Sequence, residues 1–341
     1  MKHPLPKVSV CIPVYNSEPV LRRCLDSVIN QDFQDFEIIV VNDGSAGTDE
    51  AGLTCKKIVK QAQKACPAPL KSRIKYIEHR NNLGLLEARR TAVQNASGEY
   101  ICNVDSDDAL TPGALTVLYE TAKTNDADIV QGKTDMYSLN PSEMNEKQVQ
   151  RKQKEYNKLA PGVLSGTEVF DGFIIRQNHI GLLWAKLFRR ETYLRAFSYI
   201  PFTNCVMAED MLQYFFIAYE AKKYVGIQDI VYSYTVDTGI SSSKKITDLS
   251  RWEQICSTAN VFTIIFSAIK QFPQLMLSSE QMEAFRLQSR SYLVSNLQQL
   301  KSSVVPELQE EARNLLCEYW GEDFVQMMEK AIEREEQKSA D

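Results

Sequence analysis

The first 130 residues alternate short apolar runs with stretches in which apolar residues recur at helical spacing. The apolar, β-branched runs predict strands at 8–14, 36–43, 74–78, 100–105 and 127–132. Helical spacing or a helix-start signal predicts helices between them, at 18–30, from 48 or 49 to about 65, at 84–96 and from Pro112 onward. Buried strands that alternate with helices are typical of a parallel sheet covered on both faces, so the sequence predicts an α/β fold.

The pattern changes beyond this region. It predicts, in chain order, a polar loop or exposed helical excursion at 138–160, helices near 167–177 and 209–222, a strand at 225–236, and helices from about 246 onward. We therefore expect one domain over 1–240, with a first half of about 1–132 and a second half of about 160–240, followed by a helical C-terminal region at 246–341.

Composition places the chain among ordinary globular proteins. Hydrophobic residues make up 44% of its 341 residues and charged residues 24%, so a largely disordered chain is excluded. Lys and Arg number 39 against 44 Asp and Glu, which leaves a net charge of −5. An acidic chain has no overall field that attracts DNA or RNA, so we expect no nucleic-acid partner.

The cysteines and the apolar runs bear on location. No pair among the eight cysteines has C-x-x-C spacing, which argues against a structural zinc site and against a redox pair. The N-terminus leads directly into a strand pattern without a signal peptide, and the run at 261–269 is half of a membrane span. We expect a cytoplasmic protein with reduced thiols, and peripheral contact with the inner face of a membrane stays open.

Polar residues follow three of the predicted strands. Ligands of parallel sheets bind beyond the carboxyl ends of the strands, so these positions are the first candidates for chemistry. Asp105 and Asp107 follow a buried strand with one residue between them, which suits Mg²⁺ or Mn²⁺ together with substrate phosphate. The plainer alternative is a polar loop in which Asp107 or Asp108 caps the next helix.

Asp43 follows the second strand. Its carboxylate could accept the ring N–H of uracil, while Tyr15 offers an aromatic face and Gly44 allows close backbone approach. The chain contains neither the P-loop pattern nor the G-x-G-x-x-G fingerprint, so those two routes to phosphate binding are excluded.

Other candidates have ordinary structural explanations. Glu209 and Asp210 begin a helix pattern, where adjacent acids commonly interact with the helix dipole. Trp184 is expected in the core, and His79 and His179 are single histidines for which structural roles are favoured.

Taken together, the motifs resemble the family-2 inverting glycosyltransferases of the GT-A fold. The resemblance rests on these segments, in the family's order: VSVCIPVYN, FEIIVVNDGS, NNLGLLEARR, GEYICNVDSDD, WAKLFRR, AED and Y-S-Y followed by GIS. It covers about residues 7–241 and leaves the helical C-terminal third aside.

The resemblance implies a nucleotide-diphospho-sugar transferase fold with a mainly parallel sheet, in which 1–240 is the catalytic domain, 1–132 its nucleotide-sugar half and 160–240 its acceptor half. It also implies roles for single residues. On the nucleotide side, Pro13, Tyr15 and Glu18 line the nucleoside pocket, Asp43 binds the base, and Gly84 and Arg89 support the nucleotide. Asp105 contacts ribose or metal, Asp107 holds Mg²⁺ or Mn²⁺, Asp210 is the catalytic base, and the acceptor is bound or supported by Trp184, Lys186 and Glu209.

The implied function is transfer of a sugar, with inversion, from a nucleotide-diphosphate donor to a hydroxyl of a glycan or lipid-linked glycan, as in surface polysaccharide synthesis. The Asp43 pocket favours UDP. Two alternatives stay open, namely a catalytically inactive nucleotide-sugar binding module and a metal-dependent nucleotidyltransferase. For the C-terminal helices, acceptor binding, a homodimer face and membrane contact stay open beside simple core packing.

Overall fold

The computed structural model describes residues 5–138, 146–203, 205–236 and 245–340. The chain divides into two compact units, which are described separately. The first comprises Met1–Asn204 and Gln213–Ile240, and the second comprises Cys205–Leu212 and Ser241–Asp341.

The first unit is built around one sheet. In the described part of the chain its nine strands are β1 (Val8–Val14), β2 (Phe36–Asn42), β3 (Ile74–Glu78), β4 (Tyr100–Asn103), β5 (Ala109–Leu110), β6 (Ile129–Tyr137), β7 (Gly162–Ser165), β8 (Lys186–Arg189) and β9 (Lys223–Thr235). They lie in the order β3-β2-β1-β4-β8-β6-β9-β5, and β7 pairs with β9.

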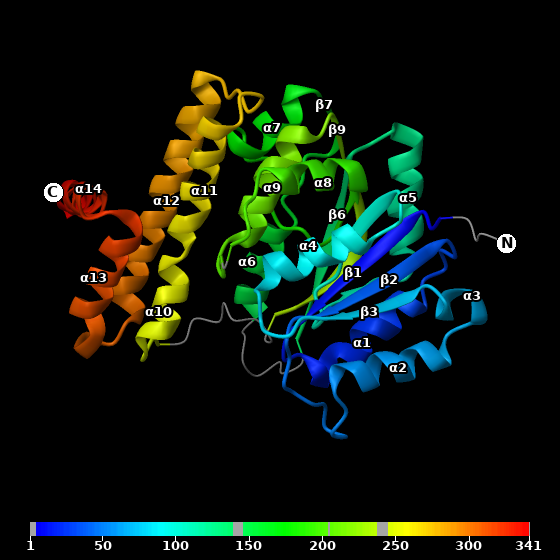
Figure 1. Cartoon of the computed structure of the whole chain (residues 1–341). Coiled ribbons are helices and arrows are strands. Elements are labelled where there is room, and N and C mark those ends of the chain that lie inside the picture. The colour runs from blue at the N-terminus through cyan, green and yellow to red at the C-terminus, as the bar shows by residue number, and fades with distance from the viewer. Residues whose placement is uncertain (1–4, 139–145, 204, 237–244, 341) are drawn as a thin grey trace. The chain divides into compact units, whose positions relative to one another are not determined.

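Helices cover this sheet on both faces. They are α1 (Glu18–Ile29), α2 (Cys55–Ala65), α3 (Ala68–Lys71), α4 (Leu85–Asn95), α5 (Ala114–Asn125), α6 (Glu146–Tyr156), α7 (Thr167–Ile174), α8 (Arg190–Ser198) and α9 (Glu209–Glu220), whose first turn belongs to the second unit. Helices α1 and α2 lie against one face of β1–β3, and α4 lies against the other (Figure 1).

Strands β1 to β4 confirm the expectation of a buried parallel sheet. Strands β1 and β2 are buried along their whole length, and β1 pairs in parallel with both β2 and β4. Their continuous burial explains why they read as apolar runs rather than as alternating patterns. The predicted α/β class is therefore confirmed.

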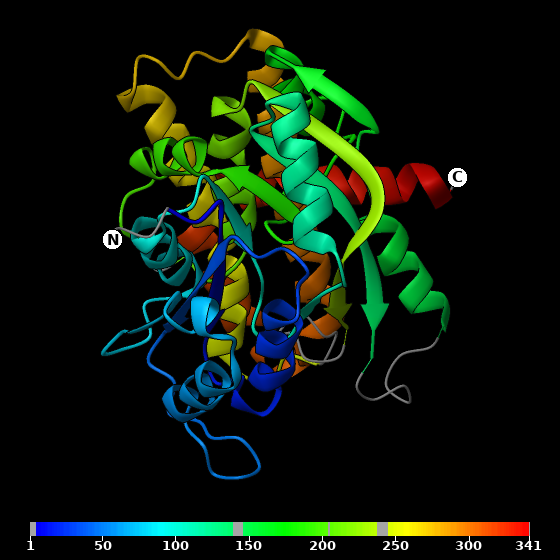
Figure 2. The same ribbon diagram turned by 90° about the vertical axis from the view of Figure 1, so that its right-hand side faces the viewer.

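The second half of the sheet contains strands that the apolar pattern did not predict. Strand β8 pairs antiparallel with both β4 and β6, and β5 and β7 pair antiparallel with β9. Strand β9 is long and curved and runs beside α5 (Figure 2). The polar stretch at 138–160 contains helix α6, whose last residue Tyr156 packs edge-on against Trp184 at a ring distance of 5.4 Å.

A histidine is buried in the core of the first unit. The His179 side chain is 2% exposed, and its ring stacks on Tyr224 at 4.5 Å. Burial, and then the charges of Lys186 and Arg176, lower the pKa of His179 to about 3. The neutral ring is therefore the form that the fold accommodates.

We expect His179 to make the free energy of unfolding depend on pH. Its pKa is lower in the folded state than in the unfolded chain, so its stabilising contribution is complete above about pH 6.5 and is lost as the pH falls toward 3. Between pH 6.5 and pH 5 the loss should be about 2 kcal/mol. Urea unfolding of the wild type and of a His179→Phe variant over this range measures it, and equal pH slopes would contradict the assignment.

The second unit is helical after its short first segment. Its helices are α10 (Leu249–Cys256), α11 (Thr258–Gln271), α12 (Ser279–Ser303), a 3₁₀ turn at Pro306–Leu308, α13 (Gln309–Trp320) and α14 (Glu322–Ala340). Trp252 and Leu293 lie in its apolar core, and the Trp252 indole donates to the Ala312 carbonyl over 2.7 Å. Ser278 caps α12 in a capping box with Gln281. Among the described helices, none has the length and hydropathy needed to cross a bilayer.

Candidate functional site

The loops that follow β1, β2 and β4 form one hydrogen-bonded network. These strands are parallel neighbours, so their carboxyl ends lie at the same edge of the sheet. The Asn16 amide donates to Ser45 Oγ over 3.0 Å, which joins the first loop to the second. The hydroxyls of Ser17 and Ser106 lie 2.6 Å apart and join the first loop to the third. Three of the predicted polar strand ends therefore meet.

Asp43 organises the loop that follows β3. Its Oδ1 lies 2.6 Å from His79 Nδ1 and accepts the Leu83 amide over 2.9 Å. Its Oδ2 accepts the Gly84 amide over 2.9 Å, and His79 Nε2 in turn lies 3.0 Å from Thr91 Oγ1. A carboxylate offers about four acceptor positions, so three protein contacts leave one unused. The Asp43 side chain is only 3% exposed, so a ligand group would have to reach that position through a nearly closed surface.

We expect Asp43→Asn to destabilise the first unit. An amide group would place N–H against N–H at one of the two backbone donors, and the charge assistance of the remaining bonds would be lost. The free energy of unfolding should fall by about 2–3 kcal/mol in urea titrations. Asp135→Asn is the matched control, because Asp135 is exposed on β6 and, within the described part of the chain, accepts a hydrogen bond from the next backbone amide alone. A change of the same size in both variants would contradict this role.

Two glycines allow the loops to approach each other. Gly44 has φ +73°, and a Cβ there would lie 2.6 Å from the Asn81 backbone. Gly84, with φ +92°, precedes α4 and gives its amide to Asp43. The loops after β2 and β3 therefore depend on both positions having no side chain.

Arg89 and Asp105 form a partly buried ion pair. Arg89, on α4, is 1% exposed, and its Nη2 lies 2.9 Å from Asp105 Oδ1. The Asp105 side chain remains 23% exposed, so one side of the carboxylate can reach a ligand. A buried guanidinium in this position fixes the direction of the carboxylate.

The third acid of the turn after β4 has a structural role. Asp108 is 1% exposed, and its carboxylate accepts the Tyr232 hydroxyl over 2.8 Å and the Thr235 amide over 2.7 Å. Burial, and then the Asp107 and Asp105 carboxylates, raise the pKa of Asp108 well above its usual range. The helix-cap alternative is wrong, because α5 begins only at Ala114 and Asp108 binds β9 instead.

Asp105 and Asp107 are the carboxylates that fit a cation. Among the described residues no group of three or more His, Cys, Asp or Glu side chains forms a cage for a metal. Mg²⁺ and Mn²⁺ are commonly held through one or two carboxylates together with phosphate oxygens and water. Two partly exposed carboxylates one residue apart match that chemistry, with Asp105 also held by Arg89.

The predicted nucleoside residues differ in accessibility. Tyr15 is 52% exposed, whereas Pro13 is buried within β1. Glu18 is also buried, and both of its carboxylate oxygens lack a hydrogen-bond partner among the described residues. A Cβ at Gly47 would lie 2.6 Å from Glu18 Oε2, so the loop after β2 covers this carboxylate. Of the three, Tyr15 is the one open to a ligand.

Trp184 and Lys186 are packing residues of the first unit. Trp184 stacks on Tyr232 at 5.1 Å and on Tyr234 at 5.2 Å. Lys186 is fully buried, donates to the Leu182 carbonyl, and lies over the Tyr214 ring at 5.2 Å. Both side chains support the sheet, and contact of either with an acceptor stays a prediction.

Glu209 and Asp210 occupy the first turn of α9 and belong to the second unit. Burial, and then the Asp210 and Glu209 carboxylates, raise the pKa of Tyr292 on α12 to about 12. The acid pair therefore lies near a buried phenol of the C-terminal helices. The predicted GIS segment, 239–241, lies outside the described residues.

Sequence reasoning assigned no role in this network to four of its residues, which are His79, Arg23, Tyr232 and Thr235. A signal for His79 existed, because it directly follows β3 at the same sheet edge. Tyr232 lies in the Y-S-Y motif, but no local signal predicts its contacts or those of Thr235 with the turn at 105–108, since they span more than 120 positions of the chain.

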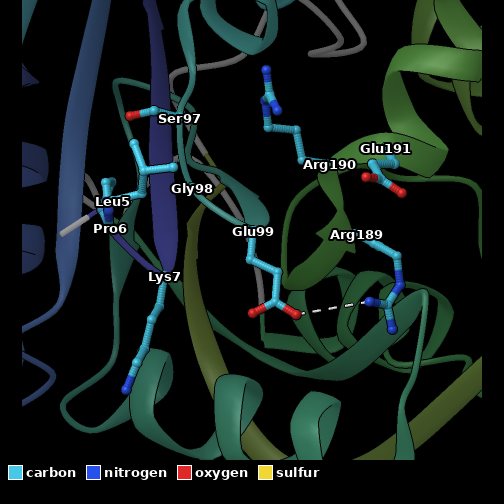
Figure 3. A pocket seen from close by; sticks show the side chains of 9 residues that line it. All are labelled: Leu5, Pro6, Lys7, Ser97, Gly98, Glu99, Arg189, Arg190 and Glu191. Atoms are coloured by element: carbon cyan, nitrogen blue, oxygen red, sulfur yellow. Dashed lines mark ion pairs between the residues drawn. The ribbon is translucent and has the colours of Figure 1, made fainter.

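A separate cavity of about 420 Å³ lies at the other end of the sheet. It is lined by residues that precede β1 and β4 and by the start of α8, and Figure 3 shows Glu99 directed toward Arg189. Lys7 and Arg190 point away from each other there (Figure 3). The cavity contains none of the predicted site residues.

Comparison with known proteins supports the resemblance. Over 137 residues the chain is 43% identical to the glycosyltransferase GlyA of Streptococcus pneumoniae, which covers 40% of this chain and 18% of GlyA. The chain spans less than two-fifths of the first curated relatives that it matches, from 18% to 38% of their length.

Solved structures share the fold. TarS 1–349 of S. aureus, in complex with UDP-GlcNAc, aligns with a TM-score of 0.56 at 20% identity, over 96% of this chain and 92% of that one. The mannosyltransferase PcManGT of Pyrobaculum calidifontis, in complex with GDP-Man and Mn²⁺, aligns with a TM-score of 0.51 at 17% identity, over 96% and 85%. The family model "Glycosyl transferase family 2" matches residues 9–182, just over half of the chain, so the chain belongs to family 2 of the glycosyltransferases and has the GT-A fold.

Proposed function

We propose that the chain transfers a sugar from a UDP-sugar to a hydroxyl of a glycan or lipid-linked glycan, with inversion at the anomeric carbon. The observation that carries the proposal is the network that joins the loops after β1, β2 and β4, with Asp43, Arg89, Asp105 and the Asp107 turn around one sheet edge. Membership of the family supplies the reaction class.

The nucleoside side of the proposal rests on Asp43 and Tyr15. The free acceptor position of Asp43 suits the ring N–H of uracil, and the exposed Tyr15 ring can stack on the base. Asp105, held by Arg89, would accept a ribose hydroxyl. The likeness to TarS, solved with UDP-GlcNAc, supports UDP, and the likeness to a GDP-mannose enzyme makes GDP the competitor to test.

The diphosphate side rests on Asp107 with Asp105. These carboxylates would hold Mg²⁺ or Mn²⁺, and a bound cation would supply positive charge to the leaving diphosphate. The chain's own part is to fix the two carboxylates before the donor arrives, through Arg89 on one side and the turn at 105–108 on the other.

Asp210 is proposed as the general base. Its carboxylate would take the proton of the acceptor hydroxyl while that oxygen attacks the anomeric carbon from the face opposite the diphosphate, which inverts the configuration. We further propose a cytoplasmic location, at the inner face of the membrane where the acceptor is lipid-linked, and the free thiols of the eight cysteines agree with it.

A screen of nucleotide sugars for hydrolysis and transfer, with Mn²⁺ and with chelator, tests the proposal. We expect turnover of a UDP-sugar that requires the metal and releases UDP. Release of pyrophosphate from a nucleoside triphosphate and a sugar phosphate would instead indicate a nucleotidyltransferase. Tight binding of a UDP-sugar without turnover under any condition would indicate an inactive binding module.

A further inference from the structure

The backbone carbonyl of Asp107 is held from two sides. Arg23 Nη2, on α1, donates to it, and Thr235 Oγ1, at the end of β9, donates to it over 2.7 Å. Arg23 Nη2 also donates to Thr235 Oγ1 over 2.5 Å, so the three groups form a closed triangle. One peptide group of the turn is thereby fixed by elements from opposite ends of the first unit's sequence.

Strand β9 holds the rest of the same turn. The Tyr232 hydroxyl accepts the Asp105 amide over 3.1 Å and donates to Asp108 over 2.8 Å. The Thr235 amide donates to the other oxygen of Asp108. Asp105, two residues before Asp107, and Asp108, the residue after it, are therefore tied to β9. Together with the bonds to the Asp107 carbonyl, they set the direction in which the Asp107 side chain leaves the backbone.

Arg23 is unusual in its surroundings. Among the described residues its guanidinium donates hydrogen bonds to the Asp107 carbonyl and the Thr235 hydroxyl and lies over the ring of Tyr137, 4.8 Å from the guanidinium carbon. Its Nε is buried and has no hydrogen-bond partner in the part of the chain that the structure describes. A cation that is partly desolvated without a carboxylate partner is costly, and the acids of the adjacent turn are the charges that offset this cost.

We propose that Arg23 and Thr235 are positioning residues for the cation-binding carboxylate of Asp107. They fix the peptide group after Asp107, and so keep its carboxylate in the orientation that a cation and a diphosphate require. The inference rests on the proposed function, because it assigns these residues to the metal site of that reaction.

Titration of Mn²⁺ in the presence of UDP, followed by electron paramagnetic resonance of free Mn²⁺, tests the inference without using activity. We expect Arg23→Met to weaken Mn²⁺ binding by about 10- to 100-fold, as for other residues that orient a metal ligand. Arg22→Met is the matched control, because Arg22 is the preceding residue on α1 and, among the described residues, forms its ion pair with Asp26 on the exposed face. It should bind Mn²⁺ as the wild type does.

A second pair of variants keeps the test valid if Arg23→Met does not fold. Thr235→Val removes only the hydroxyl and should weaken Mn²⁺ binding, whereas Thr235→Ser keeps the hydroxyl and should restore it to within about twofold. A purely structural role would lower the unfolding midpoint of Thr235→Val and leave Mn²⁺ binding of the folded protein unchanged, which overturns the inference. If the wild type itself binds no Mn²⁺ with UDP, the metal-dependent function fails, and the inference fails with it.

Discussion

Asp107→Ala should abolish Mn²⁺-dependent binding of UDP and lower sugar transfer by about a thousandfold. Asp107 is one of two partly exposed carboxylates at this sheet edge, and Asp105 shares its charge with the buried Arg89. Removing Asp107 therefore leaves a single, already paired carboxylate for the cation. Without a bound cation, the charge on the departing diphosphate would not be neutralised.

Calorimetric titration of UDP with Mn²⁺ and with chelator measures the effect of Asp107→Ala, and the initial rate with the donor identified by the screen measures transfer. Asp135→Ala is the control for loss of an acid elsewhere in the same sheet. If Asp107→Ala responds to Mn²⁺ as the wild type does, Asp107 is not the metal ligand.

Asp210→Asn should retain donor binding and lower transfer by about 10²- to 10⁴-fold. Asparagine preserves the shape of the side chain and cannot accept a proton, so the acceptor hydroxyl would have to attack without losing its proton to the enzyme. Donor hydrolysis by water should fall by a similar factor, since water needs the same base. The Kd for UDP with Mn²⁺ should stay within about twofold of the wild-type value.

The comparison with Glu209→Gln identifies which of the adjacent acids is the base. We expect Glu209→Gln to keep most of the transfer rate, because it removes the neighbour and leaves the carboxylate of Asp210. Full turnover by Asp210→Asn, or a larger loss in Glu209→Gln than in Asp210→Asn, would remove Asp210 from the role.

The fold was predictable where strands are buried on both faces. Val8–Val14 and Phe36–Asn42 read as strands because every position is buried and apolar or β-branched residues dominate. Strand β8, Lys186–Arg189, was not predicted because it is short and begins and ends with a cation. Its lysine is stabilised by a carbonyl and by the Tyr214 ring, which are tertiary contacts that no local pattern contains.

The site was predictable where a strand ends. Asp43, Asp105 and Asp107 follow β2 and β4 directly, so the parallel sheet alone brings their loops to one edge. Arg23 was not predictable, because along α1 it is spaced like an ordinary polar residue and its partner Thr235 is 212 positions away. The burial of Glu18 could not be predicted either, because the loop that covers its carboxylate, at Gly47, is distant in the sequence.

Calorimetric titration of UDP into the wild-type chain, once with Mn²⁺ and once with chelator, tests the central claim most directly. If the acids after β2 and β4 form one site for a nucleotide and its cation, UDP should bind with a stoichiometry of one and at least about tenfold more tightly with Mn²⁺. Equal affinity in both solutions, or no binding in either, would contradict the account.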